Sequence, residues 1–206
     1  MNPLLGVLIS YLAGSIPFAY LAGRARGVDL RQHGSGNLGA SNAVRVLGPR
    51  IGAIVYIGDT LKGLLPVLVL PPYINSVNPE LWAIVFGLAA VVGHVRPIFL
   101  LGKGGGKGVA TGGGVFLGLA WLPTLVAAVV FALVLSITRI SSVSSLSAAV
   151  TLPIAIAFWA GPRTPLFIMS VAVLTLVLWT HRSNIERLRR GEEPKVGQKK
   201  AEVPVR

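Results

Sequence analysis

Two lysines and eight glycines lie close together at residues 101–114, between apolar segments. Glycine lets backbone N–H groups approach an anion closely, and lysine adds a compensating positive charge. Neither common nucleotide-binding motif fits this segment, because Gly108 follows Lys107 where a Walker loop needs Ser or Thr, and no G-x-G-x-x-G occurs within it. We therefore predict a phosphate-binding loop over 104–111, of a kind other than a nucleotide-binding loop.

The glycines of this segment also have a structural interpretation. Small residues in membrane proteins often serve only to bring helices close together. That interpretation fits the glycines of 112–118 as well as ligand binding does, whereas helix packing does not require Lys103 and Lys107. We expect 112–118 to form a packing face of a short helix and 104–111 to bind phosphate.

Other polar residues gather in segments between the apolar stretches. These polar segments are 24–49, 94–111, 139–147 and 181–193. They supply mainly Arg, Lys, His, Ser and Asn, and the acids we expect nearby are Asp59 and Glu193. Ionisable residues at membrane depth are costly, so several that converge on one membrane face predict a functional site. Cationic side chains and glycine amides suit an anionic, phosphate-bearing substrate.

The composition is that of an integral membrane protein. The chain has 206 residues, of which 53% are hydrophobic and 13% charged, and its mean hydropathy is +0.72. Cysteine is absent, which excludes disulfides, thiolate zinc sites and cysteine nucleophiles. The net charge of +12 indicates basic cytoplasmic loops and contact with anionic lipid. Nucleic-acid binding is disfavoured, because the basic residues are scattered among the spans.

The apolar stretches predict an all-α membrane fold with seven transmembrane helices and short interfacial or re-entrant elements. The expected spans are 3–23, 50–70, 80–101, 109–121, 122–138, 146–160 and 166–180. We divide 109–138 into two helices, because one long helix would place Arg139 and the basic tail opposite Arg24 and Arg26. The same charge rule places the N-terminus outside and the C-terminus in the cytoplasm.

The remaining segments follow from this topology. Polar segment 24–49 suits a short interfacial or re-entrant helix, and 140–147 an inner polar insertion. One transmembrane domain spans 1–193, followed by a basic, disordered tail at 194–206. Carboxylates that could hold magnesium are scarce, so we expect chemistry without a metal or another cofactor.

The ordered set of motifs resembles the PlsY family, bacterial membrane glycerol-3-phosphate acyltransferases that use acyl phosphate. The resemblance covers residues 11–197. It comprises GSIP at 14–17, SGNLGASN at 35–42 with Arg45 and Gly48, Asp59 with Lys62-Gly63, Gly93-His94, GGKGVAT at 105–111, Ser142 with Ser145, and His181-Arg182, Asn184-Ile185, Arg187-Leu188, Gly191 and Glu193. The Phe-Lys pair that commonly precedes the Gly-Gly-Lys core is replaced here by Lys103-Gly104, which leaves the role of Lys103 open.

The resemblance implies transfer of a fatty acyl group from acyl phosphate to the sn-1 hydroxyl of glycerol 3-phosphate. The products are lysophosphatidic acid and phosphate, in the first step of phospholipid synthesis. The implied setting is the bacterial inner membrane, with the site facing the cytoplasm. Implied partners are both substrates and membrane lipid, and a soluble enzyme that makes acyl phosphate is a candidate partner.

The resemblance also implies roles for individual residues. The expected catalytic residues are Ser35, Arg45, Lys107, His181 and Asn184, and the expected substrate-binding residues are Asn37, Asn42, Gly105, Gly106, Gly108, Thr111, Ser142 and Glu193, with no metal ligand. Ser35 and Asn37 would contact acyl phosphate or cap a short helix. Lys107 and the loop amides would stabilise the departing phosphate. His181 would orient glycerol 3-phosphate or only form a hydrogen bond, and Glu193 would brace the site or remain a solvated tail charge.

No side chain stands out as a general base, so we expect the substrate phosphate to take the proton of the attacking hydroxyl, without an acyl-enzyme. The main alternative is a membrane transporter for a phosphorylated small solute. The gathering of polar segments on one face and the lack of a visible inverted repeat count against a transporter. A membrane scaffold for a soluble partner is a second alternative.

Overall fold

Helices account for the regular structure of residues 1–197, which are the part of the chain that the computed structural model describes. No strand occurs within these residues, as the apolar pattern predicts. The α-helices are α1 (Pro3–Ser15), α2 (Phe18–Arg24), α3 (Ala40–Leu47), α4 (Pro49–Val69), α5 (Pro79–Val95), α6 (Val109–Leu119), α7 (Trp121–Thr138), α8 (Ser141–Ala160), α9 (Pro165–Thr180) and α10 (Arg182–Arg189). Short 3₁₀ turns, η1 (Pro71–Tyr73) and η2 (Ile98–Leu100), follow α4 and α5.

Within residues 1–197, five segments are long and apolar enough to cross a membrane. They are Pro3–Arg24, Pro49–Tyr73, Pro79–Leu100, Trp121–Thr138 and Ser141–Ala160. Helix α9 joins α10 across a 57° bend, and counted together they make a sixth candidate. Helix α6 has only 11 residues, about 16 Å at 1.5 Å per residue, against a hydrocarbon core of roughly 30 Å. The break between α6 and α7 at Ala120 confirms the predicted division of 109–138 into two helices.

Two predicted boundaries are corrected by the structure. The first span is not one helix, because α1 ends at Ser15 and α2 starts at Phe18, and Pro17 between them has no N–H to continue the ladder. The predicted polar insertion at 140–147 is not a separate element, because Ile140 caps α8 and 141–147 form its first two turns. There the Ser144 hydroxyl donates to the Ile140 carbonyl (2.9 Å), so serine satisfies its polar group within the helix.

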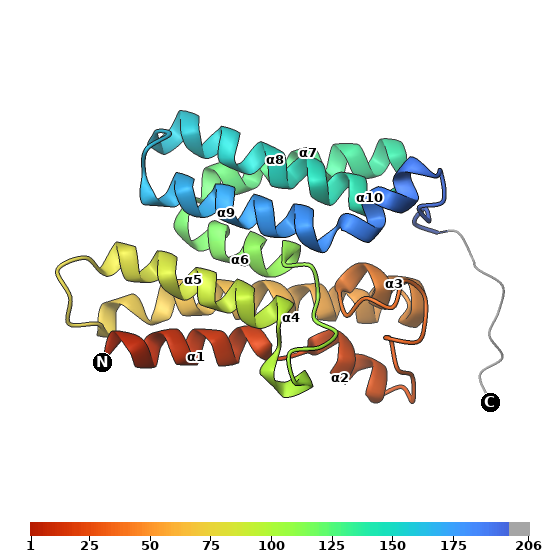
Figure 1. Cartoon of the computed structure of the whole chain (residues 1–206), viewed down its shortest axis with the longest axis horizontal. Coiled ribbons are helices and arrows are strands. Elements are labelled where there is room, and N and C mark those ends of the chain that lie inside the picture. The colour runs from red at the N-terminus through yellow and green to blue at the C-terminus, as the bar shows by residue number, and fades with distance from the viewer. Residues whose placement is uncertain (198–206) are drawn as a thin grey trace.

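Helices that follow one another, such as α4 and α5 or α7 and α8, run in opposite directions, whereas α1 and α5 run in the same direction, as do α4 and α6; the polar segments lie together at one end (Figure 1). The segment after α2, the loop after α5, the α7–α8 turn and α10 all lie at that end. Helix α1 packs along α5, α4 along α6, and α7 along α8. The predicted gathering of polar segments is therefore present in the fold.

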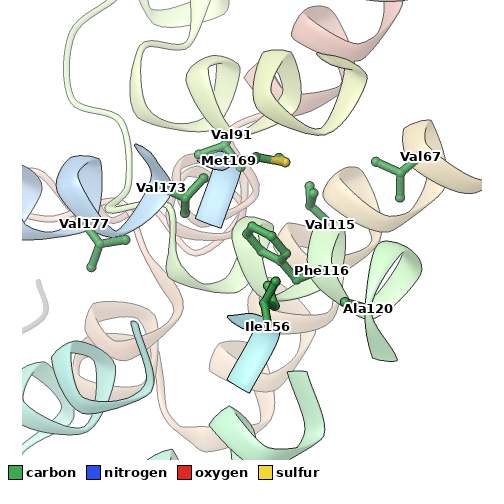
Figure 2. Close-up of a cluster of buried hydrophobic side chains, with 9 residues drawn as sticks. All are labelled: Val67, Val91, Val115, Phe116, Ala120, Ile156, Met169, Val173 and Val177. Atoms are coloured by element: carbon green, nitrogen blue, oxygen red, sulfur yellow. The ribbon is translucent and has the colours of Figure 1, made fainter. Parts of the chain in front are cut away.

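An apolar core joins α4, α5, α6, α8 and α9 (Figure 2). It consists of Val67, Val91, Val115, Phe116, Ala120, Ile156, Met169, Val173 and Val177. Phe116 and Ile156 are fully buried there. Helix α7 contributes little to this core and is mostly exposed, as expected of a helix that faces lipid. This core holds α6 in the middle of the bundle, with its first turn beside the polar end.

Candidate active site

A cavity of about 460 Å³ runs from the polar end of the bundle into its apolar interior. Polar side chains line one end of it, and they are Ser35, Asn37, Arg45, Lys107, Ser142, His181, Asn184, Arg187 and Glu193 among others. Apolar side chains of α6, α7, α8 and α9 line the remainder, including Phe116, Leu117, Leu125, Ala127, Phe131, Ala148, Leu152 and Val173. The cavity can therefore hold a charged group at one end and an apolar chain along the other.

Lys107 reaches this polar end from the glycine-rich loop. Its Nζ donates to Asn184 Oδ1, and its carbonyl accepts from Thr180 Oγ1 at 3.0 Å, so α9 and α10 hold both its side chain and its backbone. Gly108, which follows, is the N-cap of α6 and adopts φ +86°, a conformation that favours glycine. Burial lowers the pKa of the Lys107 ammonium to about 8, against the opposing charge of Glu193.

Glu193 is a hub for three other side chains. Its Oε1 accepts from Ser142 Oγ at 2.7 Å and from Asn184 Nδ2, and its Oε2 pairs with Arg187 Nε at 2.7 Å. Burial alone would raise the pKa of this carboxyl, but the hydrogen bonds from Asn184, Ser142 and Arg187 bring it below the usual value of 4.5. The bracing ion pair expected of Glu193 is thus present, and its side chain is buried rather than solvated.

His181 lies at the bend between α9 and α10. Its Nδ1 is 2.8 Å from the Val177 carbonyl. Because a carbonyl only accepts, Nδ1 carries the proton and Nε2 is left as the acceptor nitrogen of the neutral ring. Burial, together with the neighbouring Lys107 charge, lowers the pKa of this imidazole to about 4. His181 is therefore a neutral hydrogen-bond acceptor at pH 7 and a weak base.

The first polar segment supplies a second wall of the cavity. Ser35, Asn37 and Arg45 all line it, and Arg45 comes from the last turn of α3. The residue that caps α3 is Gly39, without a side-chain cap, so neither Ser35 nor Asn37 caps that helix. Their hydroxyl, amide and guanidinium groups face the same cavity as Lys107.

Comparison with known proteins identifies the family. A family model described as glycerol-3-phosphate acyltransferase matches residues 4–191. The chain belongs to this family. Curated relatives named glycerol-3-phosphate acyltransferase include one from Prochlorococcus marinus (strain NATL1A), 43% identical over 199 residues, covering 95% of this chain and 98% of the relative. Another, from Geotalea daltonii, is 46% identical over 187 residues and covers 91% of this chain and 94% of the relative.

Solved structures agree with the family. The chain is similar to a crystal structure of PlsY, an integral membrane glycerol 3-phosphate acyltransferase, in its glycerol 3-phosphate form, with a TM-score of 0.87 and 36% identity. That match covers 95% of this chain and 96% of the other. The lysophosphatidic acid form of PlsY matches with a TM-score of 0.84 and 34% identity, over 95% of each chain. The chain is therefore an integral membrane protein of the PlsY fold.

Three residues that we expected to bind substrate in this PlsY family member are placed differently. Gly105 and Gly106 do not line the large cavity, and the Gly106 N–H donates to the His94 carbonyl (3.1 Å). A side chain on Gly105 would meet the Val95 carbonyl at 2.1 Å, so both glycines serve close packing against the end of α5. Thr111 is fully buried outside the cavity, with its backbone against Gly63 of α4.

Asn42 has a structural role. It lines the cavity, but its Oδ1 accepts from the Ser35 N–H (2.8 Å) and its Nδ2 donates to the Leu30 and His33 carbonyls (both 3.1 Å). These bonds use both ends of the amide to shape the polar loop before α3. Asn42 therefore positions Ser35, and its Nδ2 already donates to two backbone carbonyls.

The glycines of α6 divide differently from the expectation. Gly114 and Gly118 pack against α4, where a side chain on Gly114 would meet the Thr60 carbonyl at 2.0 Å. Gly112 and Gly113 instead line the cavity. The packing interpretation of 112–118 thus holds for its second half only.

Asp59, which we expected near the site, and His94 also line the cavity, although neither was assigned a catalytic or substrate-binding role. The signal that could have found them is an ionisable residue inside an apolar span, which by itself indicates function. Both are almost fully buried, at 1% and 5% exposure.

Proposed function

We propose that this chain transfers a fatty acyl group from acyl phosphate to the sn-1 hydroxyl of glycerol 3-phosphate. The products are lysophosphatidic acid and inorganic phosphate, in the first step of phospholipid synthesis. The observation that carries this proposal is one cavity that combines a cationic, hydrogen-bonding end with an apolar arm. The phosphates of both substrates suit the cationic end, and the acyl chain of the donor suits the apolar arm.

The reaction needs modest chemical help, because the mixed anhydride of acyl phosphate is already activated. The hydroxyl oxygen forms an ester bond to the acyl carbon, and the bond between that carbon and the phosphate oxygen breaks. The hydroxyl proton passes to the departing phosphate, so no acyl-enzyme forms. Positioning and charge neutralisation supply most of the acceleration. A weakly basic His181 fits this mechanism, since it can accept a hydrogen bond from the hydroxyl without taking its proton.

We assign the two walls of the cavity to the two substrates. Ser35, Asn37 and Arg45 contact acyl phosphate, and Lys107 with the Gly108 amide neutralises the departing phosphate. Ser142, His181 and Asn184 orient glycerol 3-phosphate, and Glu193 holds Ser142 and Asn184 in place. No metal or other cofactor is required, because the carboxylates at the cavity already pair with cations, Asp59 with Lys62 and Glu193 with Arg187.

The orientation follows from the charges. We propose seven spans, with α6 and α9 added to the five long segments, the N-terminus outside and the polar end facing the cytoplasm of the bacterial inner membrane. Residues 1–193 are then one transmembrane acyltransferase domain. Of the predicted basic tail, 198–206 lie outside the described residues, and the Val196 N–H donates to the Arg139 carbonyl (2.7 Å). A soluble enzyme that makes acyl phosphate would deliver its product at this face.

The absence of cysteine allows a direct test of this orientation. Single cysteines at Asn75, between η1 and α5, and at Arg189, in α10, should react oppositely with a membrane-impermeant maleimide. The maleimide should label Asn75→Cys in intact cells. It should label Arg189→Cys only after the cells are permeabilised. The reverse pattern would overturn the proposed orientation.

The activity itself is tested by phosphate release from palmitoyl phosphate in purified, reconstituted protein. Release should require glycerol 3-phosphate, yield lysophosphatidic acid and persist with EDTA. Lys107→Ala should lose about 10²–10³-fold in kcat while the protein remains folded. Lys103→Ala is the matched control, because Lys103 does not line the cavity. Movement of glycerol 3-phosphate across the bilayer without phosphate release would instead favour the transporter alternative.

A further inference from the structure

A cluster of buried charges lies against the glycine-rich loop, and two of its members, Asp59 and His94, also line the large cavity. It joins Asp59 and Lys62 of α4 to His94 of α5. Lys62 Nζ is 2.7 Å from Asp59 Oδ1, and His94 Nδ1 is 3.6 Å from the same oxygen. All three side chains are at most 4% exposed. Charges this deeply buried are costly and persist only when they are paired.

This cluster is anchored to the break in the first span. Lys62 Nζ donates to the Ile16 carbonyl at 2.7 Å, at the point where α1 stops and α2 has not yet started. A carbonyl left open at membrane depth needs such a donor. The same ammonium lies 5.7 Å from the centre of the Phe18 ring. Lys62 therefore links the cluster to the backbone of Ile16 and to the ring of Phe18.

The imidazole of His94 is in direct contact with the glycine-rich loop. A side chain built on Gly106 would lie 2.1 Å from His94 Nε2, and the Gly106 N–H donates to the His94 carbonyl (3.1 Å). The space left between the cluster and the loop is about 10 Å³, lined by Lys62, His94 and residues 104–106 among others. That volume is at the lower limit for one water molecule. The loop therefore cannot sink toward α5 without displacing the imidazole.

Resting on the proposed function, we propose that His94 is a positioning residue for Lys107. Its imidazole, whose Nδ1 lies 3.6 Å from Asp59 Oδ1, sets the position of Gly106, one residue before Lys107, and so the distance from the ammonium to the reacting phosphate. Misplacement of a charge-neutralising group by about 1 Å can cost on the order of 10²-fold in rate. His94 thereby acts on the reaction through Lys107.

The contact between His94 and Gly106 offers a double-mutant test. His94→Ala should lower kcat more than it raises either KM, because Lys107 acts mainly in the transition state. Gly106→Ala should also lower kcat at least tenfold, because its methyl group collides with the imidazole. In the double variant the methyl group fills the space that the imidazole leaves, so Gly106→Ala should cost less than threefold in that background. The two effects would then be strongly coupled.

Gly105→Ala is the matched control. Its methyl group would meet the Val95 and His94 carbonyl groups, at 2.1 and 2.6 Å, which the His94→Ala change leaves in place. Gly105→Ala should therefore lower kcat by the same factor in the wild-type and His94→Ala backgrounds. Thermal unfolding in detergent reports folding for each variant, and His94→Asn replaces His94→Ala in the cycle should the latter fail to fold.

Two results would overturn the positioning role. One is an equal cost of Gly106→Ala with and without the imidazole, and the other is wild-type kcat in His94→Ala. Wild-type protein that releases no phosphate from palmitoyl phosphate would instead overturn the proposed function. The cycle thus separates failure of the positioning role from failure of the activity.

Discussion

The chemistry of the polar end depends on how burial tunes Lys107. The ammonium lies among other cations, and Glu193 is the carboxylate that opposes its deprotonation. A pKa of about 8 leaves most Lys107 side chains charged at pH 7, but this pKa is only slightly above that pH. The charge required to neutralise phosphate is therefore sensitive to mild alkali.

This sensitivity predicts an alkaline limb in the pH profile. The kcat/KM for acyl phosphate should fall as pH rises through about 8, because free Lys107 then loses its proton. Lys107→Arg should retain part of the activity and shift that limb above pH 10, since arginine stays protonated. Measurement of kcat/KM from pH 6 to 10 for both proteins checks this. The same limb in Lys107→Arg would mean that another group titrates.

Glu193 predicts an acid effect on stability. Its lowered pKa means that its contribution is present above the usual value of 4.5 and is lost as pH falls through the folded pKa. Glu193→Gln should therefore lower Tm at pH 7, and this difference from wild type should shrink as pH falls below 4.5 and through the folded pKa. We also expect the KM for glycerol 3-phosphate to rise about tenfold, because Ser142 and Asn184 lose a charged acceptor.

The neighbouring Glu192→Gln is the control for that effect. Glu192 is exposed and does not line the cavity, so its loss should leave Tm and KM within error of wild type. Equal effects at 192 and 193 would point to net charge rather than to the hydrogen-bonded hub.

Among the helices, α6 is positioned by its glycines. Gly114 lies against the carbonyl of Thr60 on α4, whereas Gly113, one residue earlier, has no heavy atom within 4 Å of an added methyl group. The two positions share a helix and a residue type but differ in surroundings. Substituting each of them therefore distinguishes the effect of helix packing on stability from the effect of helix propensity.

Alanine at these two positions should have opposite effects on stability. Gly114→Ala should force α4 and α6 apart and cost about 1–3 kcal/mol, since overpacking of a filled interface carries that penalty. Gly113→Ala should be neutral or stabilise by up to about 1 kcal/mol, because alanine favours the helix. Thermal unfolding in detergent measures both. A loss of stability at Gly113 as large as that at Gly114 would contradict the packing account.

At this scale the sequence predicts the helices better than the environment of single residues. Hydropathy located the five long apolar segments and the break near Trp121, because it depends on long runs of residues. The prediction of a polar insertion at the serines of 141–147 was wrong. A serine hydroxyl that bonds within its own helix cannot be distinguished in the sequence from one in a loop. Likewise, Gly106 and Gly108 have the same residue type, and only the fold shows that one packs against His94 while the other faces the cavity.

In the whole molecule, the apolar arm of the cavity lies between the α7–α8 pair and α6 with α9. Its lining residues come from helices far apart in sequence, so no local motif announces it. Ala127 of α7 is buried and lines this arm, whereas Val129, two residues later, is 50% exposed and does not. Under the proposed function, the depth of this arm sets which acyl chains fit.

A larger side chain in the arm should shift the chain-length preference. Ala127→Phe should lower kcat/KM for palmitoyl phosphate at least tenfold while leaving that for octanoyl phosphate within about threefold, because only the longer chain reaches the added ring. Competition between the two donors measures the ratio directly. Val129→Phe should leave the ratio unchanged. An unaltered preference in Ala127→Phe would place the acyl chain elsewhere.

Glu193 follows every apolar helix among residues 1–197, yet it holds Ser142 and Asn184 in place. During synthesis, α1 to α9 therefore leave the ribosome before this carboxylate does. A nascent chain can insert its helices while two proposed substrate-binding side chains still lack their acceptor. The order of translation thus delays a fully assembled site until the membrane part has been made.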